Sequence, residues 1–282
     1  MPLIEIKNLT HIYSKGTALE NKALDSVSFS IEKGEFIGVI GPTGSGKSTL
    51  IKHINGLLKP TSGKVIIDNI DIFSNNKATN DIRKKVGIVF QYPEYQLFEE
   101  TVYKDISFGP RNMGLSSDLI NKRVLKAMEF ISLKKELLDR SPFELSGGEQ
   151  RKTAIAGVIA MQPEVLILDE PSAGLDPKSK EEVLTNIKKY HENQGNTVIM
   201  VSHSMEDVLR FSDRILVMNE GRVYMFDKPS NIFKQADSLE KIGLNVPDIT
   251  KIMIGLKNKG FDVDSSIYTL KDALKNIEKL LR

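Results

Sequence analysis

Cysteine is absent from the 282 residues of this sequence. Its absence excludes disulfide bonds and thiolate metal sites, and it fits a protein that works in a reducing compartment. An excess of either charge is also absent, since 39 Lys and Arg stand against 37 Asp and Glu, for a net charge of +2. Such a balance gives no electrostatic reason to expect nucleic acid as the main partner.

Long apolar runs are missing as well. The longest, at 165–168 and 197–201, have the length of strands and are far shorter than the roughly 20 residues that cross a bilayer. The first residues, MPLIEIKNLTHIY, lack the basic and then apolar layout of a secretory signal. We therefore expect a chain that does not cross a membrane by itself, so that any pore would come from another polypeptide.

Short apolar segments of strand length alternate with segments of helical periodicity. Strands are expected at 3–7, 27–31, 36–40, 65–67, 86–90, 165–168, 197–201 and 214–218. Helices are expected at 48–57, 112–140, 146–161 and 178–193, the last one solvent-exposed because of its charges, and a polar loop at 75–81. This order predicts an α/β fold with a largely parallel sheet covered by helices and an antiparallel β portion at the start.

The last part of the sequence, from about residue 228, has no long strand-like run. Its apolar residues follow the spacing of short amphipathic helices at Leu239, Ile242, Val246, Ile249, Ile252 and Met253. The pattern predicts a main domain at 1–227 and a small helical extension at 228–282.

A glycine-rich segment, GPTGSGKS at 41–48, lies between an expected strand and an expected helix. This layout is typical of a phosphate-binding loop, because glycines let backbone N–H groups surround phosphate oxygens and a lysine adds charge for the β- and γ-phosphates. The predicted nucleotide-binding residues are Gly41, Pro42, Thr43, Gly44, Ser45, Gly46, Lys47, Ser48 and Thr49. Ser48 can also offer its hydroxyl to Mg²⁺. A chance glycine turn is the alternative, which the flanking strand and helix disfavour.

Two carboxylates, Asp169 and Glu170, follow the expected strand at 165–168. Taken alone, an apolar run before Asp-Glu marks only the end of a strand. Beside a phosphate-binding loop, the pair predicts that Asp169 holds Mg²⁺ and that Glu170 activates the attacking water as a general base.

The segment LSGGEQ at 145–150 stands between these two motifs and directly before an expected helix. Alone it would be a helix cap and turn. Here Gly147 and Gly148 would leave the helix N-terminus open, so that its N–H groups and the Ser146 hydroxyl could meet a γ-phosphate. Since the chain already has its own phosphate-binding loop, this second element would serve the nucleotide of a second chain.

These motifs together resemble the ATP-binding-cassette (ABC) ATPases over residues 3–227. The resemblance implies the P-loop NTPase fold of that family, with a helical subdomain at about 92–160, and it implies ATP and Mg²⁺ as ligands. The implied functional residues are the catalytic Glu170, His203, Gln91 and Lys47, the magnesium-binding Ser48, Gln91 and Asp169, the signature Ser146, Gly147, Gly148 and Gln150, Tyr13 stacked on adenine, and Asp176 of SAGLD at the dimer interface.

Single residues of this set have simpler explanations when taken alone. A lone histidine such as His203 is more often structural, and Tyr13 could be a packing residue of a strand. The remaining histidines, His11, His53 and His191, match no motif, and we interpret them as ordinary.

The stretch QYPEYQLFEETVYKDISFGP at 91–110 resembles the energy-coupling-factor branch of the family, as does GLNVPDI at 243–249 in the extension. Among that branch the ATP-binding subunit of cobalt importers is similar. The resemblance implies a second ATPase subunit, which the extension helps to bind, an integral membrane transporter subunit, a substrate-binding membrane protein, and a place on the cytoplasmic face of the membrane. Cobalt, nickel and vitamins are the substrates implied.

The same stretch offers a docking hypothesis. Leu97 and Phe98 would form an apolar patch rimmed by Glu94, Glu99 and Glu100, which would fit a basic helix of a membrane protein. In the alternative, the two apolar side chains pack inward and the acids are solvated.

Three other functions compete with transport. A cassette ATPase that acts on the ribosome or DNA is one, although this chain has a single cassette and no heptad run between its nucleotide motifs. A small-molecule kinase or GTPase would leave LSGGEQ and SAGLD unexplained, and no Asn-Lys-x-Asp guanine reader is present. A non-catalytic scaffold disagrees with the intact Lys47 and Glu170.

Overall fold

The computed structural model describes residues 2–264 and 267–280, which form two sheets and several groups of helices. The strands are β1 (Ile4–Tyr13), β2 (Asn21–Ile31), β3 (Phe36–Ile40), β4 (Ser62–Ile67), β5 (Ile70–Asp71), β6 (Val86–Val89), β7 (Val165–Asp169), β8 (Thr197–Val201), β9 (Arg214–Asn219) and β10 (Arg222–Asp227). The helices are α1 (Lys47–Ile54), α2 (Asn76–Lys85), α3 (Val102–Asn112), α4 (Ser117–Phe130), α5 (Gly147–Ala160), α6 (Pro177–Gln194), α7 (Met205–Phe211), α8 (Pro229–Phe233), α9 (Ala236–Lys241), α10 (Asp248–Asn258) and α11 (Leu270–Leu280), with a short 3-10 helix η1 (Pro93–Gln96).

The larger sheet has six strands in the order β10-β9-β3-β8-β7-β6. Strands β9, β3, β8, β7 and β6 are parallel, and β10 is antiparallel to β9. Every residue of β3, β7 and β8 is buried, as expected for parallel strands that are covered on both faces. The predicted parallel sheet is therefore confirmed, and the carboxyl ends of its central strands meet at one edge.

The smaller sheet is antiparallel, with the order β2-β1-β4-β5, and confirms the predicted antiparallel portion. One hydrophobic core joins this sheet, α1 and one face of the larger sheet. Leu50 and Ile51 of α1 lie in it with Ile37 and Val39 of β3, whereas Phe36 belongs to the core on the opposite face. Side chains of β3 thus alternate between the two cores. Those on one face pack against α1 and so fix this helix, and the loop before it, against both sheets.

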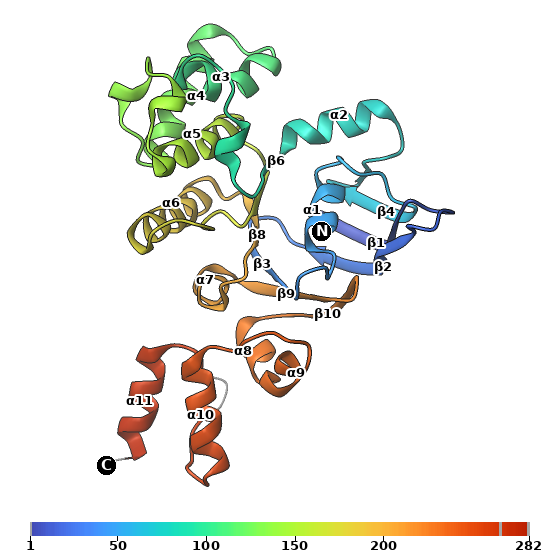
Figure 1. Cartoon of the computed structure of the whole chain (residues 1–282), viewed down its shortest axis with the longest axis vertical. Coiled ribbons are helices and arrows are strands. Elements are labelled where there is room, and N and C mark those ends of the chain that lie inside the picture. The colour runs from blue at the N-terminus through green and yellow to red at the C-terminus, as the bar shows by residue number, and fades with distance from the viewer. Residues whose placement is uncertain (1, 265–266, 281–282) are drawn as a thin grey trace.

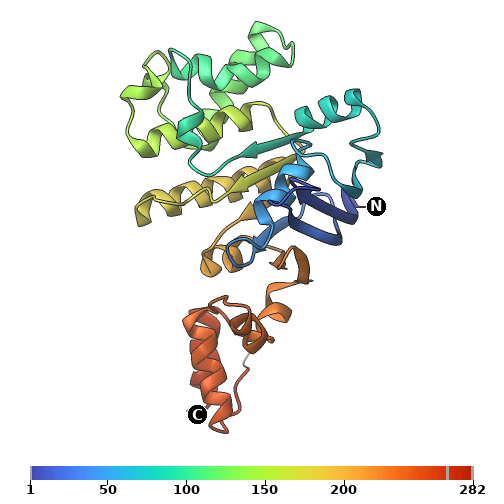
Figure 2. The same ribbon diagram turned by 45° about the vertical axis from the view of Figure 1, so that its right-hand side comes forward.

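Helices α3, α4 and α5 pack on one another at one end of the molecule, while α8 to α11 lie at the opposite end, as Figures 1 and 2 both show. The helical stretch expected at 112–140 is confirmed in part, because α4 lies within it, but its bounds are wrong. Helix α3 begins earlier, at a cap where the Thr101 hydroxyl accepts a bond from the Lys104 N–H, and it ends before Gly114, which has a φ of +74°. Helix α4 then starts separately after Ser116.

Two further expectations are corrected. The polar segment at 75–81 is not a loop but belongs to α2, which starts where the Asn75 side chain accepts a bond from the Ala78 N–H; its polar surface arises because only Ile82 is buried. Helix α6 is not an exposed helix, because Leu184, Ile187 and Tyr190 are buried on one of its faces. The charged residues on its other face made the sequence resemble that of an exposed helix.

The C-terminal extension is helical in the described residues, and it has two parts. Apolar residues of α8 and α9, such as Phe233 and Leu239, belong to the core of the main domain. Met253, Val263 and Ala273 form a small separate cluster with α10 and α11. Residues 265, 266, 281 and 282 of the predicted extension lie outside the described residues. Within 2–264 and 267–280, no helix is both long and apolar enough to span a bilayer.

Replacing Ile187 by alanine tests the buried face of α6. The side chain is 0% exposed, so its truncation should lower the free energy of unfolding by about 2–5 kcal/mol. Lys189→Ala, at an exposed position of the same helix, is the control and should change stability by less than about 0.5 kcal/mol. Urea unfolding followed by circular dichroism measures both, and equal effects would contradict the packing of α6.

Candidate active site

The predicted catalytic residues follow neighbouring strands of the parallel sheet. The phosphate-binding loop comes after β3, Glu170 after β7 and His203 two residues after β8. The backbone continues the strand pairing beyond these ends, since the Ser202 N–H donates to the Val39 carbonyl (3.2 Å) and the Glu170 N–H to the Val201 carbonyl (3.0 Å). The sheet therefore gathers the three segments at one edge, where ligands of open α/β sheets bind.

The phosphate-binding loop is held closed by its own lysine. Lys47 Nζ donates to the carbonyl oxygens of Gly41 (2.7 Å) and Pro42 (2.9 Å). Gly46 has a φ of +97°, and a Cβ there would lie 2.5 Å from the Ala23 carbonyl oxygen. The loop can follow this path only with glycine, which explains the spacing that the sequence shows.

Lys47 is buried beside two carboxylates. Burial lowers the pKa of Lys47, and the nearby Glu170 and Asp169 partly offset this effect. Burial likewise raises the pKa of Asp169, against the hydrogen bond from the Ser48 side chain. The edge of the sheet thus holds one desolvated cation, Lys47, and two desolvated carboxylates, Asp169 and Glu170. Binding of a polyanionic ligand together with a cation would change the pKa values of all three groups.

Glu170 and His203 face each other. His203 Nε2 lies 3.3 Å from Glu170 Oε1, and the His203 side chain is 62% exposed while that of Glu170 is 11% exposed. Burial raises the pKa of Glu170, and the adjacent His203 opposes this rise. Glu170 has a φ of +53°, a left-handed backbone that is uncommon for a residue other than glycine. The strained turn directs its carboxylate toward the histidine.

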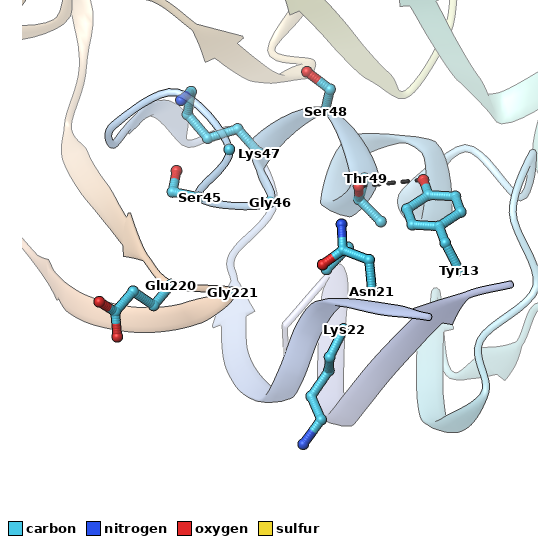
Figure 3. A pocket seen from close by; sticks show the side chains of 12 residues that line it. Tyr13, Asn21, Lys22, Ser45, Gly46, Lys47, Ser48, Thr49, Glu220 and Gly221 are labelled. Carbon is cyan, nitrogen blue, oxygen red and sulfur yellow. Dashed lines mark hydrogen bonds between the residues drawn. The ribbon is translucent and has the colours of Figure 1, made fainter. Parts of the chain in front are cut away.

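A pocket of about 410 Å³ opens over the loop, and Figure 3 shows its side chains. Tyr13, at the end of β1, lines it, and its hydroxyl lies 3.3 Å from Thr49 Oγ1. The predicted residues that line this pocket are Tyr13, Gly44, Ser45, Gly46, Lys47, Ser48 and Thr49. Stacking of Tyr13 on adenine stays a prediction.

Sequence reasoning missed part of the pocket wall. Asn21, Lys22 and Ala23 from the start of β2, and Glu220 and Gly221 from the turn between β9 and β10, also line it (Figure 3). The Gly221 N–H donates to the Ser45 carbonyl (3.2 Å), so the turn supports the loop. The dipeptide Glu-Gly between two apolar runs was a turn signal that could have located this part; the β2 residues carry no such signal.

Gln91 lies in the bend just beyond β6 and is exposed. Strand β6 is the outermost strand of the larger sheet, next to β7. Gln91 therefore stands at the same edge as Asp169 and Glu170, on the side toward the α3–α5 group.

The signature residues form a second, separate pocket. Gly147, Gly148 and Asp176 line a pocket of about 310 Å³ that shares no residue with the first. Ser146 caps α5 in a capping box, in which its hydroxyl accepts from the Glu149 N–H (3.4 Å) and its own N–H donates to the Glu149 carboxylate (3.1 Å); the hydroxyl also donates to that carboxylate (2.7 Å). A Cβ on Gly147 would meet no atom within 4 Å, so the N-terminus of α5 is open. Gln150 turns away and donates to the Pro142 carbonyl (3.1 Å).

Arg151, which directly follows the signature, connects three segments of the chain. It is 2% exposed, and it forms two bonds with Glu94 of η1, Nε to Oε2 (3.1 Å) and Nη2 to Oε1 (2.9 Å). Its Nη1 donates to the Ala173 carbonyl, and its guanidinium lies over the Tyr92 ring at 5.9 Å. One buried side chain thus links the segment after Gln91, the signature helix and the SAGLD loop.

This ion pair corrects the docking hypothesis. Glu94 is not part of a free acidic rim, because Arg151 holds it inside the subdomain. Leu97 is buried, as the inward-packing alternative expected, whereas Phe98 is 60% exposed. Glu99 and Glu100 pair with Arg111 and Lys104 at the surface.

Known proteins resemble the chain throughout its length. The sequence pattern of the family described as ABC transporter matches residues 24–173. The energy-coupling factor transporter ATP-binding protein EcfA2 of Clostridium tetani is 55% identical over 98% of this chain and 96% of its own length. The EcfA2 protein of Clostridium perfringens is 54% identical over 99% of this chain and 98% of its own length.

Solved structures agree with these relatives. The protein cbiO1 of Clostridium perfringens, described as part of the ABC transporter complex cbiONQ, is 38% identical with a TM-score of 0.76, over 90% of this chain and 99% of its own. The ATP-binding cassette MJ0796, described as a dimer bound to ADP and phosphate, is 33% identical with a TM-score of 0.72, over 80% of this chain and 98% of its own.

The chain therefore belongs to the ABC transporter family, and within it to the energy-coupling factor transporter ATP-binding proteins. It is an ATPase with the P-loop fold, and the fold class, activity and family branch predicted from its sequence are confirmed.

The Arg151–Glu94 pair can be tested by Glu94→Gln. The change removes the charge that accepts two bonds from a buried guanidinium, so the free energy of unfolding should fall by about 1–3 kcal/mol. Glu99→Gln is the matched control, because its pair with Arg111 is exposed and should contribute less than about 1 kcal/mol. Guanidinium unfolding measures the difference in the free energy of unfolding. Equal stability of the two variants would show that the buried pair stabilises the fold no more than the surface pair.

Proposed function

We propose that the chain is the nucleotide-driven motor of an importer of the energy-coupling-factor type. The observation that carries this proposal is the separation of two half-sites in one chain: the phosphate-binding loop in one pocket and the open N-terminus of α5 in another. A chain built in this way needs a second chain to complete its site.

ATP would bind with its triphosphate in the loop and its base near Tyr13. Lys47 would leave the Gly41 and Pro42 carbonyls to contact the β- and γ-phosphates, and Thr49 would lie near the α-phosphate. Tyr13 is 37% exposed at the pocket wall, so its ring is free on one side to stack on adenine.

Mg²⁺ fits the oxygen atoms at the loop. The Ser48 side chain lowers the pKa of Asp169 against the effect of burial, and hydroxyl and carboxylate oxygens are ligands that Mg²⁺ prefers. Gln91 would add a third oxygen. No group of three or more His, Asp and Glu side chains with metal-binding geometry occurs in the described part of the chain, which agrees with a cation that takes its other ligands from phosphate and water. When bound, the ion would neutralise charge on the phosphates.

Hydrolysis would use Glu170 and His203. Glu170, with its raised pKa, would accept a proton from the attacking water as a general base. His203, whose exposed ring already faces that carboxylate, would hold the water and the γ-phosphate in line. Lys47 would stabilise the charge that develops on the phosphoryl group.

Two ATPase subunits would close around ATP. The α5 N-terminus with Ser146, Gly147 and Gly148 would cover the γ-phosphate bound to the partner chain, and Asp176, which lines the same pocket as the two glycines, would lie at this interface. Gln150 would reach the interface only if its amide left the Pro142 carbonyl. ATP supplies contacts to both chains, so it favours the closed dimer, and loss of the γ-phosphate lets the dimer open. The C-terminal extension at 228–282 would contribute to pairing, with a second copy or a related subunit as the partner.

A membrane partner would dock near Phe98. Phe98 and Phe108 are 60% and 40% exposed, stack edge to face at 4.9 Å, and line a groove of about 170 Å³ between η1, α3 and α5. An integral membrane transporter subunit would place a helix there, at the cytoplasmic face of the membrane, and a substrate-binding membrane protein would select cobalt, nickel or a vitamin. The Arg151–Glu94 ion pair joins η1, beside this groove, to the signature helix α5, and it would transmit the effect of docking to that helix.

Glu170→Gln should separate binding from hydrolysis. Without the general base, the rate of ATP turnover should fall by about 10²- to 10⁴-fold, while the loop still binds ATP and traps a closed dimer. Phosphate release gives the rate, and light scattering with ATP gives the dimer. Glu192→Gln, at an exposed position of α6, is the matched control. An unchanged rate in Glu170→Gln would remove Glu170 from its role.

The importer itself can be tested by recovery of the tagged chain from its native membranes in mild detergent, with mass spectrometry of what accompanies it. An integral membrane protein, together with a second cassette subunit, is the expected result. Phe98→Asp should lose the membrane protein and keep the ATPase partner, since only the groove is altered. Recovery of ribosomal or DNA-bound proteins alone would overturn the transport proposal and leave the ATPase unaffected.

A further inference from the structure

Two histidines that match no motif lie together behind the nucleotide pocket. His11 is on β1 and is 9% exposed, and His53 is on α1 and is 0% exposed. His53 Nε2 lies 3.1 Å from His11 Nδ1, and the two rings meet at 4.7 Å and 70°. The pair therefore joins the antiparallel sheet to the helix that carries the phosphate-binding loop.

The hydrogen bonds of the pair fix where its protons lie. His53 Nδ1 is 2.8 Å from the Thr49 carbonyl oxygen, which can only accept, so this nitrogen carries a hydrogen. Burial lowers the pKa of His53 to about 4, so the ring is neutral and its Nε2 is an acceptor. His11 must then donate from Nδ1. Each ring has one tautomer that satisfies the contacts, and neither can rotate without leaving a buried polar atom unpaired.

Tyr13 is held by His11 directly and by Thr49, the residue to which His53 is bonded. The His11 ring meets the Tyr13 ring edge to face, with centroids 4.4 Å apart and planes at 78°. The Tyr13 hydroxyl lies 3.3 Å from Thr49 Oγ1, and the carbonyl of the same Thr49 is the acceptor for His53. A chain of contacts thus runs from the buried helix to an aromatic ring at the pocket wall (Figure 3 shows its outer end).

We propose that His11 and His53 are positioning residues that hold the Tyr13 ring at the angle needed to bind the base of the nucleotide. This inference rests on the proposed function, in which Tyr13 stacks on adenine. The histidines lie behind the pocket wall and are absent from its lining. Their loss should therefore weaken binding of the base and leave the triphosphate contacts and the turnover rate unchanged.

The chain contains no tryptophan, so Tyr13→Trp gives the full-length protein a single tryptophan at the site. ATP should quench its emission, and Mg-tripolyphosphate, which has no base, should compete with ATP without quenching by itself. The ratio of the two dissociation constants measures the part of the affinity that the adenosine moiety, base and ribose together, supplies. A parent protein that binds both equally would refute the role of Tyr13, and with it this inference.

His11→Ala in this background should weaken ATP binding about two- to tenfold, the size of one lost aromatic contact, with the tripolyphosphate constant unchanged. His53→Gln keeps a polar group toward His11 and should lose less than His53→Ala. In the protein with Tyr13, His11→Ala should raise the KM for ATP by the same factor and leave kcat within about twofold.

His191→Ala is the matched control, because His191 is also buried and bonded to a carbonyl, that of Asn196 (2.7 Å), but on α6 away from the pocket. It should destabilise the fold without changing either dissociation constant. Equal weakening of ATP and tripolyphosphate in His11→Ala would show that the pair supports only the loop, and unchanged constants in folded His11→Ala and His53→Ala would overturn the proposal outright.

Discussion

The parallel pairing of β3 with its neighbours is the constraint on which the site depends. Because β3, β8 and β7 run in the same direction in register, the residues after Ile40, Val201 and Asp169 must emerge at the same edge. Both faces of these strands are buried, so a shift by one residue would move each side chain into the core on the opposite face and disrupt the packing there. The loop, Glu170 and His203 are placed by the core and not by contacts among themselves.

Much of this arrangement could be predicted from the sequence. The parallel strands of the larger sheet are mostly apolar runs, whereas the antiparallel β10 is not and was not predicted. The glycine spacing of the loop and the two carboxylates after 165–168 each have one dominant physical explanation. These signals located the loop, Asp169 and Glu170, because the chemistry of phosphate binding restricts which residues can stand there. The antiparallel portion followed from strict alternation in the same way.

Other features depend on contacts between distant segments and left no local pattern. The sequence around Glu94 predicts a surface acid, but in the structure Arg151, 57 residues away, forms an ion pair with it. The apolar face of α6 was hidden by the lysines and glutamates of its other face, and α2 was hidden because one buried residue, Ile82, anchors it. The wall at Asn21 and Lys22 is polar and has no motif. Sequence periodicity does not reveal which residues are buried by contact with a segment that is distant in the sequence.

The C-terminal extension is held unevenly, and this has a consequence for its motions. Residues of α8 and α9 share the main core, whereas α10 and α11 meet in a cluster with only three buried members among the described residues, and Ile254 of α10 adds a partly buried contact with the main core. So small an apolar cluster makes a unit that opens at a lower free energy than the rest of the chain. Its amide hydrogens should exchange with solvent first, and a subunit that covers it would slow that exchange while the sheet stays protected.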